Sequence, residues 1–201
     1  METAAKPSSN LRTRANSGWL LLVGLLVLPV HATQQYRLDS SNTDVSFAVH
    51  SLGIQWVTAR FSDISGEFVI DPSGAASRVD VSVGVASLDC SEPRWNERLR
   101  SAEWLDVQRY PRMTYHSMSI ELSDQRGTAN GELTLHGITR PIVLEVTLLK
   151  CPTPKSCEFA AHGRIRRSDY GLPHGFWTGG DQVDINISGT LGSASQAMVD
   201  Q

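Results

Sequence analysis

The chain has 201 residues, of which 40% are hydrophobic and 19% are charged, and its formal net charge at pH 7 is −3. This length fits one domain with enough apolar content for a core, so the composition excludes intrinsic disorder and a multi-domain assembly. The isoelectric point near 6.0 lacks the basic signature of nucleic-acid-binding proteins. We therefore expect a globular protein without a nucleic-acid partner.

Residues 1–32 carry the features of a secretory signal peptide. Two arginines precede an uncharged apolar run at 19–28 (WLLLVGLLVL), and small residues stand at positions −3 and −1 of a cleavage site after Ala32. An uncleaved N-terminal anchor is the alternative, which Pro29 at the end of the run disfavours. We expect cleavage after Ala32 and export of residues 33–201 as one domain.

Export places the three cysteines in an oxidising compartment. Cys151 and Cys157 bracket a short segment with two prolines, CPTPKSC, where a disulfide would close a tight connection between strands. Cys90 is left without an intrachain partner. It is either a reactive or intermolecular thiol or a small residue at a strand end, and the second is favoured because no basic residue adjoins it.

Alternation of apolar and polar residues dominates the rest of the chain, most clearly at 45–49, 79–85, 142–148 and 183–187. Turn signals stand at 71–74, 124–127, 130–131 and 136–137. A period of two predicts half-buried antiparallel strands, about eight in number if the early ones join into long bent strands. The expected segments are 35–39, 43–51, 54–62, 65–71, 77–89, 112–122, 128–136, 140–150, 157–169 and 181–191.

One region, from Pro93 to Leu105, lacks this alternation. Its proline suits the first turn of a helix, and Trp95 and Leu99 are four residues apart, which places them on one helical face. We expect one or two short helices inserted between strands.

An antiparallel sheet with one apolar face needs material against that face. A lipocalin-type barrel fills the space with its own side chains or with a ligand, and a sandwich fills it with a second sheet; both agree with the pattern. An outer-membrane barrel is disfavoured because the chain ends without an aromatic residue.

Several motifs then occur in an order typical of one family. They are 50–53 (HSLG), 60–67 (RFSDISGE), 69–72 (VIDP), 99–111 (LRSAEWLDVQRYP), 131–141 (GELTLHGITRP) and 167–172 (RSDYGL). Over residues 36–191 the chain resembles the YceI-like family. The resemblance implies an all-β fold, an antiparallel eight-stranded lipocalin-like barrel with a short helical insert. It also implies export to the periplasm, enclosure of a long-chain amphiphile, and frequent dimerisation.

Two positions depart from the family pattern. Relatives commonly carry Arg-Asp-x-His-Leu where residues 95–99 read Trp-Asn-Glu-Arg-Leu, and Asn42 and Thr43 replace a His-Ser pair. If the ligand is anchored by its head group, we expect a different head group here, with the apolar enclosure unchanged.

The candidate ligand-binding residues are apolar residues of the alternating faces and of the helical insert, together with two polar residues at the mouth. The apolar set is Phe47, Val49, Phe61, Phe68, Val81, Val83, Leu99, Trp104, Leu105, Tyr115, Leu133 and Leu135. His50 and Arg98 are the polar candidates for contact with a quinone carbonyl or a phosphate. The alternative for each apolar residue is ordinary core packing, since periodicity does not distinguish a cavity from a core.

The expected function is a periplasmic carrier of a polyisoprenoid, an isoprenoid quinone or a fatty amide. The alternative is an exported stress-related or adhesion module with a packed, ligand-free interior. The sequence has no zinc-spaced His/Cys cluster, nucleophile elbow or phosphate loop, so no enzyme, metal or cofactor is expected. Beyond the lipid ligand, the candidate partners are a second copy of the chain and a quinone-reactive membrane protein.

Overall fold

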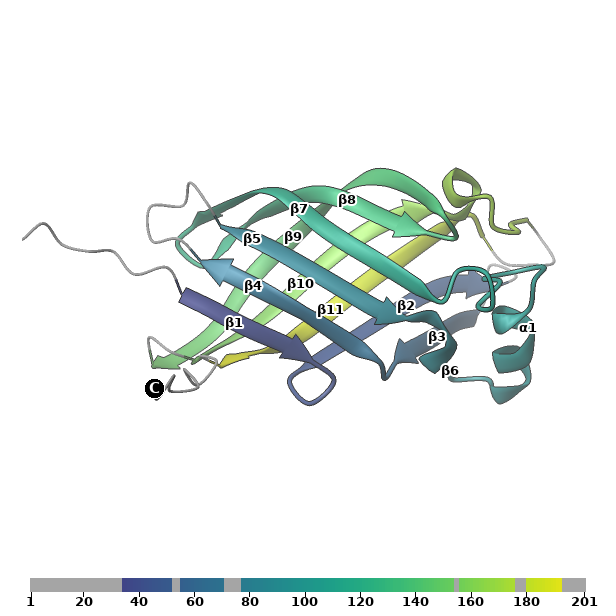
Figure 1. Ribbon diagram of the computed structural model, residues 1–201, viewed down its shortest axis with the longest axis horizontal. Coiled ribbons are helices and arrows are strands. Elements are labelled where there is room, and N and C mark those ends of the chain that lie inside the picture. The colour runs from purple at the N-terminus through teal and green to yellow at the C-terminus, as the bar shows by residue number, and fades with distance from the viewer. Residues whose placement is uncertain (1–33, 52–54, 71–76, 154–155, 176–179, 193–201) are drawn as a thin grey trace, which may run out of the picture. The chain divides into compact units, whose positions relative to one another are not determined.

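The computed structural model describes residues 34–51, 55–70, 77–153, 156–175 and 180–192, all within one compact unit (Figure 1). The predicted signal peptide, residues 1–32, lies outside the described residues, so export and cleavage stay predictions. Among the described residues, no helix is long and apolar enough to cross a membrane.

Strands account for most of the described chain. They are β1 (Gln34–Asp39), β2 (Thr43–Ser51), β3 (Gln55–Phe61), β4 (Ile64–Ile70), β5 (Arg78–Gly84), β6 (Leu88–Cys90), β7 (Arg112–Ser123), β8 (Arg126–Leu135), β9 (Ile138–Thr153), β10 (Ser156–Arg166) and β11 (Gln182–Gly192). The helical elements are η1 (Val85–Ser87), η2 (Pro93–Trp95), α1 (Asn96–Arg100) and η3 (Arg167–Tyr170). The short helices expected between Pro93 and Leu105 are therefore present as η2 and α1.

All strands belong to one antiparallel sheet with the order β1-β4-β5-β7-β8-β9-β10-β11-β2-β3-β6. The first four strands form one long bent hairpin. β1 continues into β2 and β3 continues into β4, while β2 pairs with β3 and β1 pairs with β4, so the hairpin follows the curl of the sheet. β11 and β5 flank this hairpin on opposite sides, so the curl returns on itself (Figure 1). The predicted all-β, barrel-like fold is confirmed.

The described strands number eleven rather than the expected eight. The difference arises because two short irregular segments, 40–42 and 62–63, and the single helical turn η1 interrupt three long strands. At each interruption the chain bends, which allows a strand to follow the curved wall. The three pairs β1–β2, β3–β4 and β5–β6 each correspond to one bent strand of the predicted barrel.

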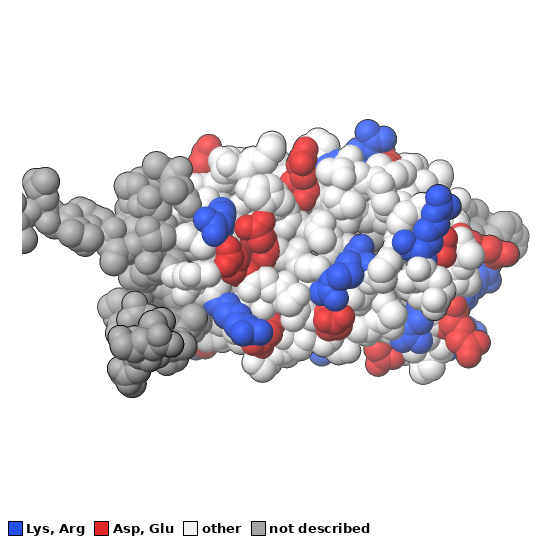
Figure 2. Space-filling view, viewed as in Figure 1, with Lys and Arg blue, Asp and Glu red and all other residues white. Residues whose placement is uncertain are grey.

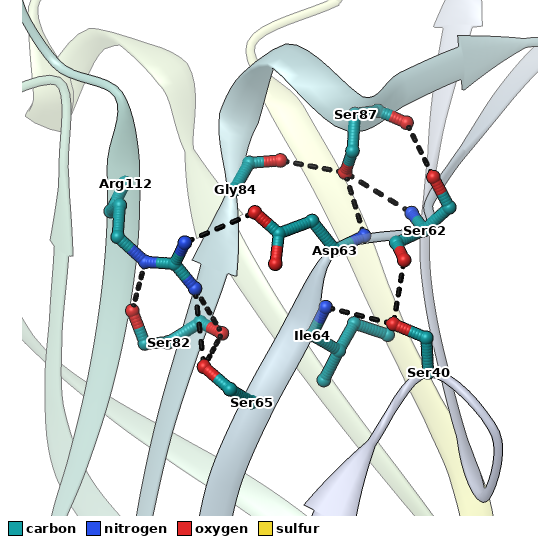
Figure 3. A network of polar contacts seen from close by, with 9 residues as sticks. All are labelled: Ser40, Ser62, Asp63, Ile64, Ser65, Ser82, Gly84, Ser87 and Arg112. Atoms are coloured by element: carbon teal, nitrogen blue, oxygen red, sulfur yellow. Dashed lines mark hydrogen bonds and ion pairs between the residues drawn. The ribbon is translucent and has the colours of Figure 1, made fainter.

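Serine side chains hold these interruptions together on the outer surface (Figure 3). The Ser87 hydroxyl donates to the carbonyl of Gly84 at 2.7 Å and accepts from the backbone amides of Ser62 and Asp63 at 3.1 and 3.0 Å. The Ser40 hydroxyl donates to the carbonyl of Ser62 at 2.6 Å and accepts from the first amide of β4 at 3.0 Å. All three interruptions are thus joined by side-chain hydrogen bonds.

Arg112 connects the same region to β7. Its Nη1 lies 3.0 Å from Oδ2 of Asp63, its Nε donates to the Ser82 hydroxyl at 2.5 Å, and its Nη2 donates to the Ser65 hydroxyl at 3.2 Å. A Cβ at Gly84 would lie 2.0 Å from Oδ2 of Asp63, so the close approach of this carboxylate requires glycine. We call this set the bend network: Ser40, Ser62, Asp63, Ser65, Ser82, Gly84, Ser87 and Arg112.

The prediction of a turn at Asn130-Gly131 is wrong, because both residues lie inside β8. The pairing of β7 with β8 shifts register between Ser117 and Ser119, which marks an irregularity in the ladder there. A Cβ at Gly131 would lie 2.8 Å from the ring of Tyr115. This glycine therefore allows an aromatic ring to cross the strand and is not a turn residue.

Cys90 ends β6, where it is buried and free. This position agrees with a small residue at a strand end. The side chain of Cys151 lies outside the described residues, so the disulfide between Cys151 and Cys157 stays a prediction.

Candidate functional site: an apolar cavity inside the sheet

The curled sheet encloses a cavity of about 210 Å³, lined by side chains from every strand except β6. An engineered apolar cavity of about 150 Å³ stays dry and binds benzene, so a space of this size accepts apolar atoms. The lining residues are overwhelmingly aliphatic or aromatic. The interior is thus shaped and coated for an apolar ligand or part of one.

The alternation seen in the sequence produces this lining. On β2, Val45, Phe47 and Val49 face inward, and Phe47 packs against Phe61 of β3 with ring centroids 5.7 Å apart. On β5, Val81 and Val83 face the cavity while Ser82 between them joins the bend network outside. Successive side chains of a strand point to opposite faces, so one strand supplies both surfaces.

All twelve predicted apolar residues come together around this cavity. The lining contains Phe47, Val49, Phe61, Phe68, Val81, Val83, Leu99, Trp104, Leu105, Tyr115, Leu133 and Leu135. Among them, the Tyr115 hydroxyl donates to the carbonyl of Ala129 at 3.0 Å, and burial raises the pKa of Tyr115 to about 12. Tyr115 therefore stays protonated and presents its ring to the cavity.

The lining also includes residues that were not singled out as candidates. Inward positions of β9, β10 and β11 contribute Ile142, Leu144, Val146, Leu148, Phe159, Ile165, Val183, Ile185, Ile187 and Leu191. The same period-two signal marks most of these residues in the sequence. Their omission reflects the choice of residues and not a missing signal.

The helical insert covers one end of the cavity with two tryptophans. Trp95 and Trp104 pack edge to face with ring centroids 6.2 Å apart, and both line the cavity. The Arg98 guanidinium stacks on both rings, 5.3 Å from the centroid of Trp95 and 5.7 Å from that of Trp104. Arg98 is exposed and is not among the lining residues.

The expected mouth formed by His50 and Arg98 therefore needs correction at Arg98. The guanidinium itself stacks on the two tryptophan rings, and the residue is exposed to solvent and outside the cavity lining. The side chain of His50 lies outside the described residues, so its role stays a prediction.

Arg167 is the one charged residue in the cavity lining within the described part of the chain. It is 5% exposed, and its guanidinium carbon lies 5.7 Å from the ring centroid of Trp104. Its backbone N–H donates to the carbonyl of Asp181 at 2.8 Å and its carbonyl accepts from Leu172 at 3.0 Å. Nη2 donates to the carbonyl of Gly180 at 2.5 Å. In the sequence this arginine begins the 167–172 motif (RSDYGL), but nothing in that motif marks it as a cavity-lining residue.

Electrostatics at Arg167 depend on burial and on one nearby acid. Burial lowers the pKa of the guanidinium, and attraction to the Asp181 carboxylate opposes this shift. The Asp181 carboxylate accepts hydrogen bonds from the amide and the hydroxyl of Ser168, each at 2.8 Å. Desolvation is the largest single influence and raises the pKa of Asp181, but the two hydrogen bonds from Ser168, together with the nearby His174 and Arg166, outweigh it, so the net pKa is lowered. Asp181 is thus ionised at neutral pH and held by η3.

The outer surface carries the rest of the charge. Acidic and basic groups lie next to each other on the face shown in Figure 2 and do not gather in one patch. Arg78 pairs with Glu67 at 2.7 Å and Arg164 with Asp184 at 2.8 Å. Among the described residues, no group of three or more His, Cys, Asp or Glu side chains could hold a metal ion.

An antiparallel β-structure curled around one apolar cavity defines the lipocalin-like class of ligand-enclosing folds. The YceI-like domain model matches residues 36–191, and the chain belongs to this family. It is 32% identical over 160 residues to a UPF0312 protein of Enterobacter sp. (strain 638), covering 76% of this chain and 83% of the relative. It is 31% identical to Protein YceI of Escherichia coli O157:H7, covering 76% and 84%.

Solved structures show the same fold. BcnA of Burkholderia cenocepacia matches with a TM-score of 0.68 and 24% identity, covering 76% of this chain and 98% of BcnA. The YCEI protein of Campylobacter jejuni matches with a TM-score of 0.62 and 25% identity, covering 68% and 85%. A polyisoprenoid binding domain from Saccharophagus degradans matches with a TM-score of 0.59 and 16% identity, covering 81% and 100%.

Proposed function

We propose that this protein is a non-enzymatic carrier that encloses the apolar tail of a long-chain amphiphile in the cavity of its curled sheet. The cavity is the observation that carries the proposal, because its wall is aliphatic and aromatic apart from very few polar residues. Each methylene removed from water contributes about 0.8 kcal/mol, so such a wall favours a long hydrocarbon chain. A polyisoprenoid, an isoprenoid quinone and a fatty amide all have one.

The relatives support this ligand class without identifying the ligand. The Saccharophagus degradans structure is described as a polyisoprenoid binding domain and shares the fold with this chain. An apolar chain needs an enclosing protein to cross an aqueous compartment, which suits the signal-like segment at 1–32 and a role in the periplasm.

Chain length provides the test of enclosure. Isoprenoid quinones quench indole fluorescence, and Trp95 and Trp104 both line the cavity. Titration with quinones that share one head group should give affinities that rise at least tenfold per added isoprene unit until the cavity is full. A double variant, Trp95→Phe with Trp104→Phe, should lose most of the quenching. Affinity that does not depend on chain length would overturn the proposal and favour a packed interior.

Export has its own measurement. Protein recovered from the periplasmic fraction of a Gram-negative host should have the intact mass of a chain that begins at Thr33. Non-reducing peptide mapping of the same sample should show Cys151 joined to Cys157 and Cys90 unmodified. A chain that retains residues 1–32, or a disulfide that includes Cys90, contradicts this part of the proposal.

A further inference from the structure

We infer that Arg167 forms a subsite for an acidic, oxygen-bearing head group at the end of the cavity covered by Trp104. This inference rests on the proposed function and adds the orientation and the head-group class of the ligand. The head group would face the Arg167 guanidinium, and the tail would extend toward Phe159, Leu148 and Leu122 at the other end of the lining.

The first support is the position of a charge in an apolar wall. Arg167 lines the cavity at 5% exposure, where a guanidinium remains protonated although burial disfavours its charge. Nη2 already donates to the carbonyl of Gly180, and a negative charge brought against the same guanidinium would be screened little by its apolar surroundings. The Asp181 carboxylate is held by Ser168 at the rim, and a ligand carboxylate would bring a second negative charge to the cavity side.

The second support is that Arg167 is held in place before any ligand arrives. Two backbone hydrogen bonds, to Asp181 and from Leu172, fix the start of η3, and the guanidinium packs over the ring of Trp104. A donor that is already ordered loses little entropy on binding. The planar guanidinium also matches the two oxygens of a carboxylate in a bidentate arrangement.

The third support is the direction that β10 gives to the site. Phe159, Ala161, Ile165 and Arg167 all line the cavity from this one segment, so the lining runs along it. Phe159 and Arg167 are eight positions apart, which is about 26 Å at the usual rise per residue of a strand. The charge stands at one end of this path, as the head group of an extended amphiphile requires.

Three probes with the same C18 chain test the head group directly in the wild-type protein. After removal of bound lipid on a hydrophobic resin, oleic acid, oleylamine and 9-octadecene are titrated at pH 8 below their aggregation concentrations. We expect oleic acid to bind at least tenfold more tightly than either of the others, because a charge-assisted hydrogen bond is worth about one to two decades in affinity. Equal affinity for the acid and the amine overturns the inference.

Matched variants assign the preference to Arg167. Arg167→Met should weaken oleic acid binding at least tenfold and leave octadecene binding within twofold, whereas Arg98→Met, on the solvent side of Trp104, should change neither. Arg167→Lys keeps the charge and loses the planar fork, and it should retain preference for the acid over the amine. An equal loss for acid and octadecene in Arg167→Met, or loss of the preference in Arg98→Met, also overturns the inference.

The wild-type titration separates this inference from the proposal beneath it. If none of the three probes binds, the proposed enclosure of a long chain fails. If all three bind with similar affinity, enclosure stands and the head-group subsite fails. Thermal unfolding of each variant without ligand identifies one that is misfolded, and the wild-type comparison then decides alone.

Discussion

The inner wall and the bend network are built on the same strands and follow opposite rules. On β5, Val81 and Val83 face the cavity, while Ser82 between them accepts from Arg112 outside. The network satisfies its polar groups with one another at exposed positions, whereas the wall contains little that can form a hydrogen bond. A register shift of one residue would exchange the two surfaces. By holding the bends in place, the network therefore also holds the register that turns the apolar side chains inward.

The bend network and the inner wall each contain one arginine, and the two arginines differ in their surroundings. Arg112 has a side chain that is 40% exposed and is bonded to Asp63, Ser65 and Ser82, so its neighbours explain it as a structural residue. Arg167 is buried in the otherwise apolar cavity wall, where its guanidinium packs over Trp104 and donates to the carbonyl of Gly180. Substitution on each side of the strands should therefore have different consequences, in stability outside and in ligand binding inside.

The largest effect should come from a charge placed in the inner wall. Leu133→Lys puts an ammonium group into the cavity lining and should abolish retention of a long-chain ligand. The neighbouring Glu132→Lys changes charge on the exposed face and should retain ligand as the wild type does. Extractable lipid and thermal unfolding are measured on the same samples. An unfolded Leu133→Lys protein would indicate a filled core, because a buried unpaired charge costs several kcal/mol there.

The next effect tests the bend network. Arg112→Ala removes hydrogen bonds to Ser65 and Ser82 and the ion pair with Asp63, each worth about 0.5–1.5 kcal/mol before solvent screening. We expect the free energy of unfolding to fall by about 2 kcal/mol in urea titration. Arg164→Ala, which loses one surface pair with Asp184, should cost less than about 1 kcal/mol. Equal effects would show that the network adds nothing beyond an ordinary surface ion pair.

A smaller effect on stability should appear at acid pH. It comes from Asp181, which accepts hydrogen bonds from Ser168 of η3 at one end of the cavity. The pKa of Asp181 is lowered from an ordinary 3.8, so its contribution to stability is present above pH 3.8 and is lost as the pH falls through the folded-state value. Asp181→Asn should remove this part of the pH dependence, measured as the midpoint of thermal unfolding between pH 2 and pH 6. If the unfolding midpoints of the wild type and the variant differ by the same amount at every pH in this range, Asp181 does not contribute to the pH dependence.

The smallest effect concerns two buried tyrosines. The Tyr170 hydroxyl is buried and has no hydrogen-bond partner among the described residues, whereas the Tyr115 hydroxyl donates to the carbonyl of Ala129. Tyr170→Phe should be neutral or stabilise by up to about 1 kcal/mol, and Tyr115→Phe should destabilise by about 1 kcal/mol. Chemical denaturation of the two variants measures the difference, and the reverse order would be inconsistent with these contacts.

Alternation of residue type was sufficient to predict the inner wall. Val45, Phe47 and Val49 face inward on β2 as their spacing indicates, because a strand with one dry face has no other arrangement. The bends were only partly predictable. Ser40, Ser62 and Ser87 lie far apart in sequence, and their hydrogen bonds exist only after the strands have paired.

The charged end of the cavity could not be predicted for a related reason. Arg98 and Arg167 are both arginines near apolar residues in the sequence and both contact Trp104, and only the folded structure shows that Arg98 is exposed while Arg167 lines the cavity. The Asn130-Gly131 pair shows the same limit, because a glycine that permits close approach of the Tyr115 ring carries the same local signal as a turn glycine.

Enclosure of a long-chain ligand is the central claim, and mass spectrometry of the protein's own contents tests it most directly. Protein is purified from the periplasm of a Gram-negative host without detergent, extracted with organic solvent, and compared with Leu133→Lys prepared in parallel. The account predicts a long-chain amphiphile in the wild-type extract, near one molecule per chain, and its loss from a folded variant. A folded wild-type protein whose extract contains no such molecule, and which takes none up when long-chain lipids are supplied, would contradict it.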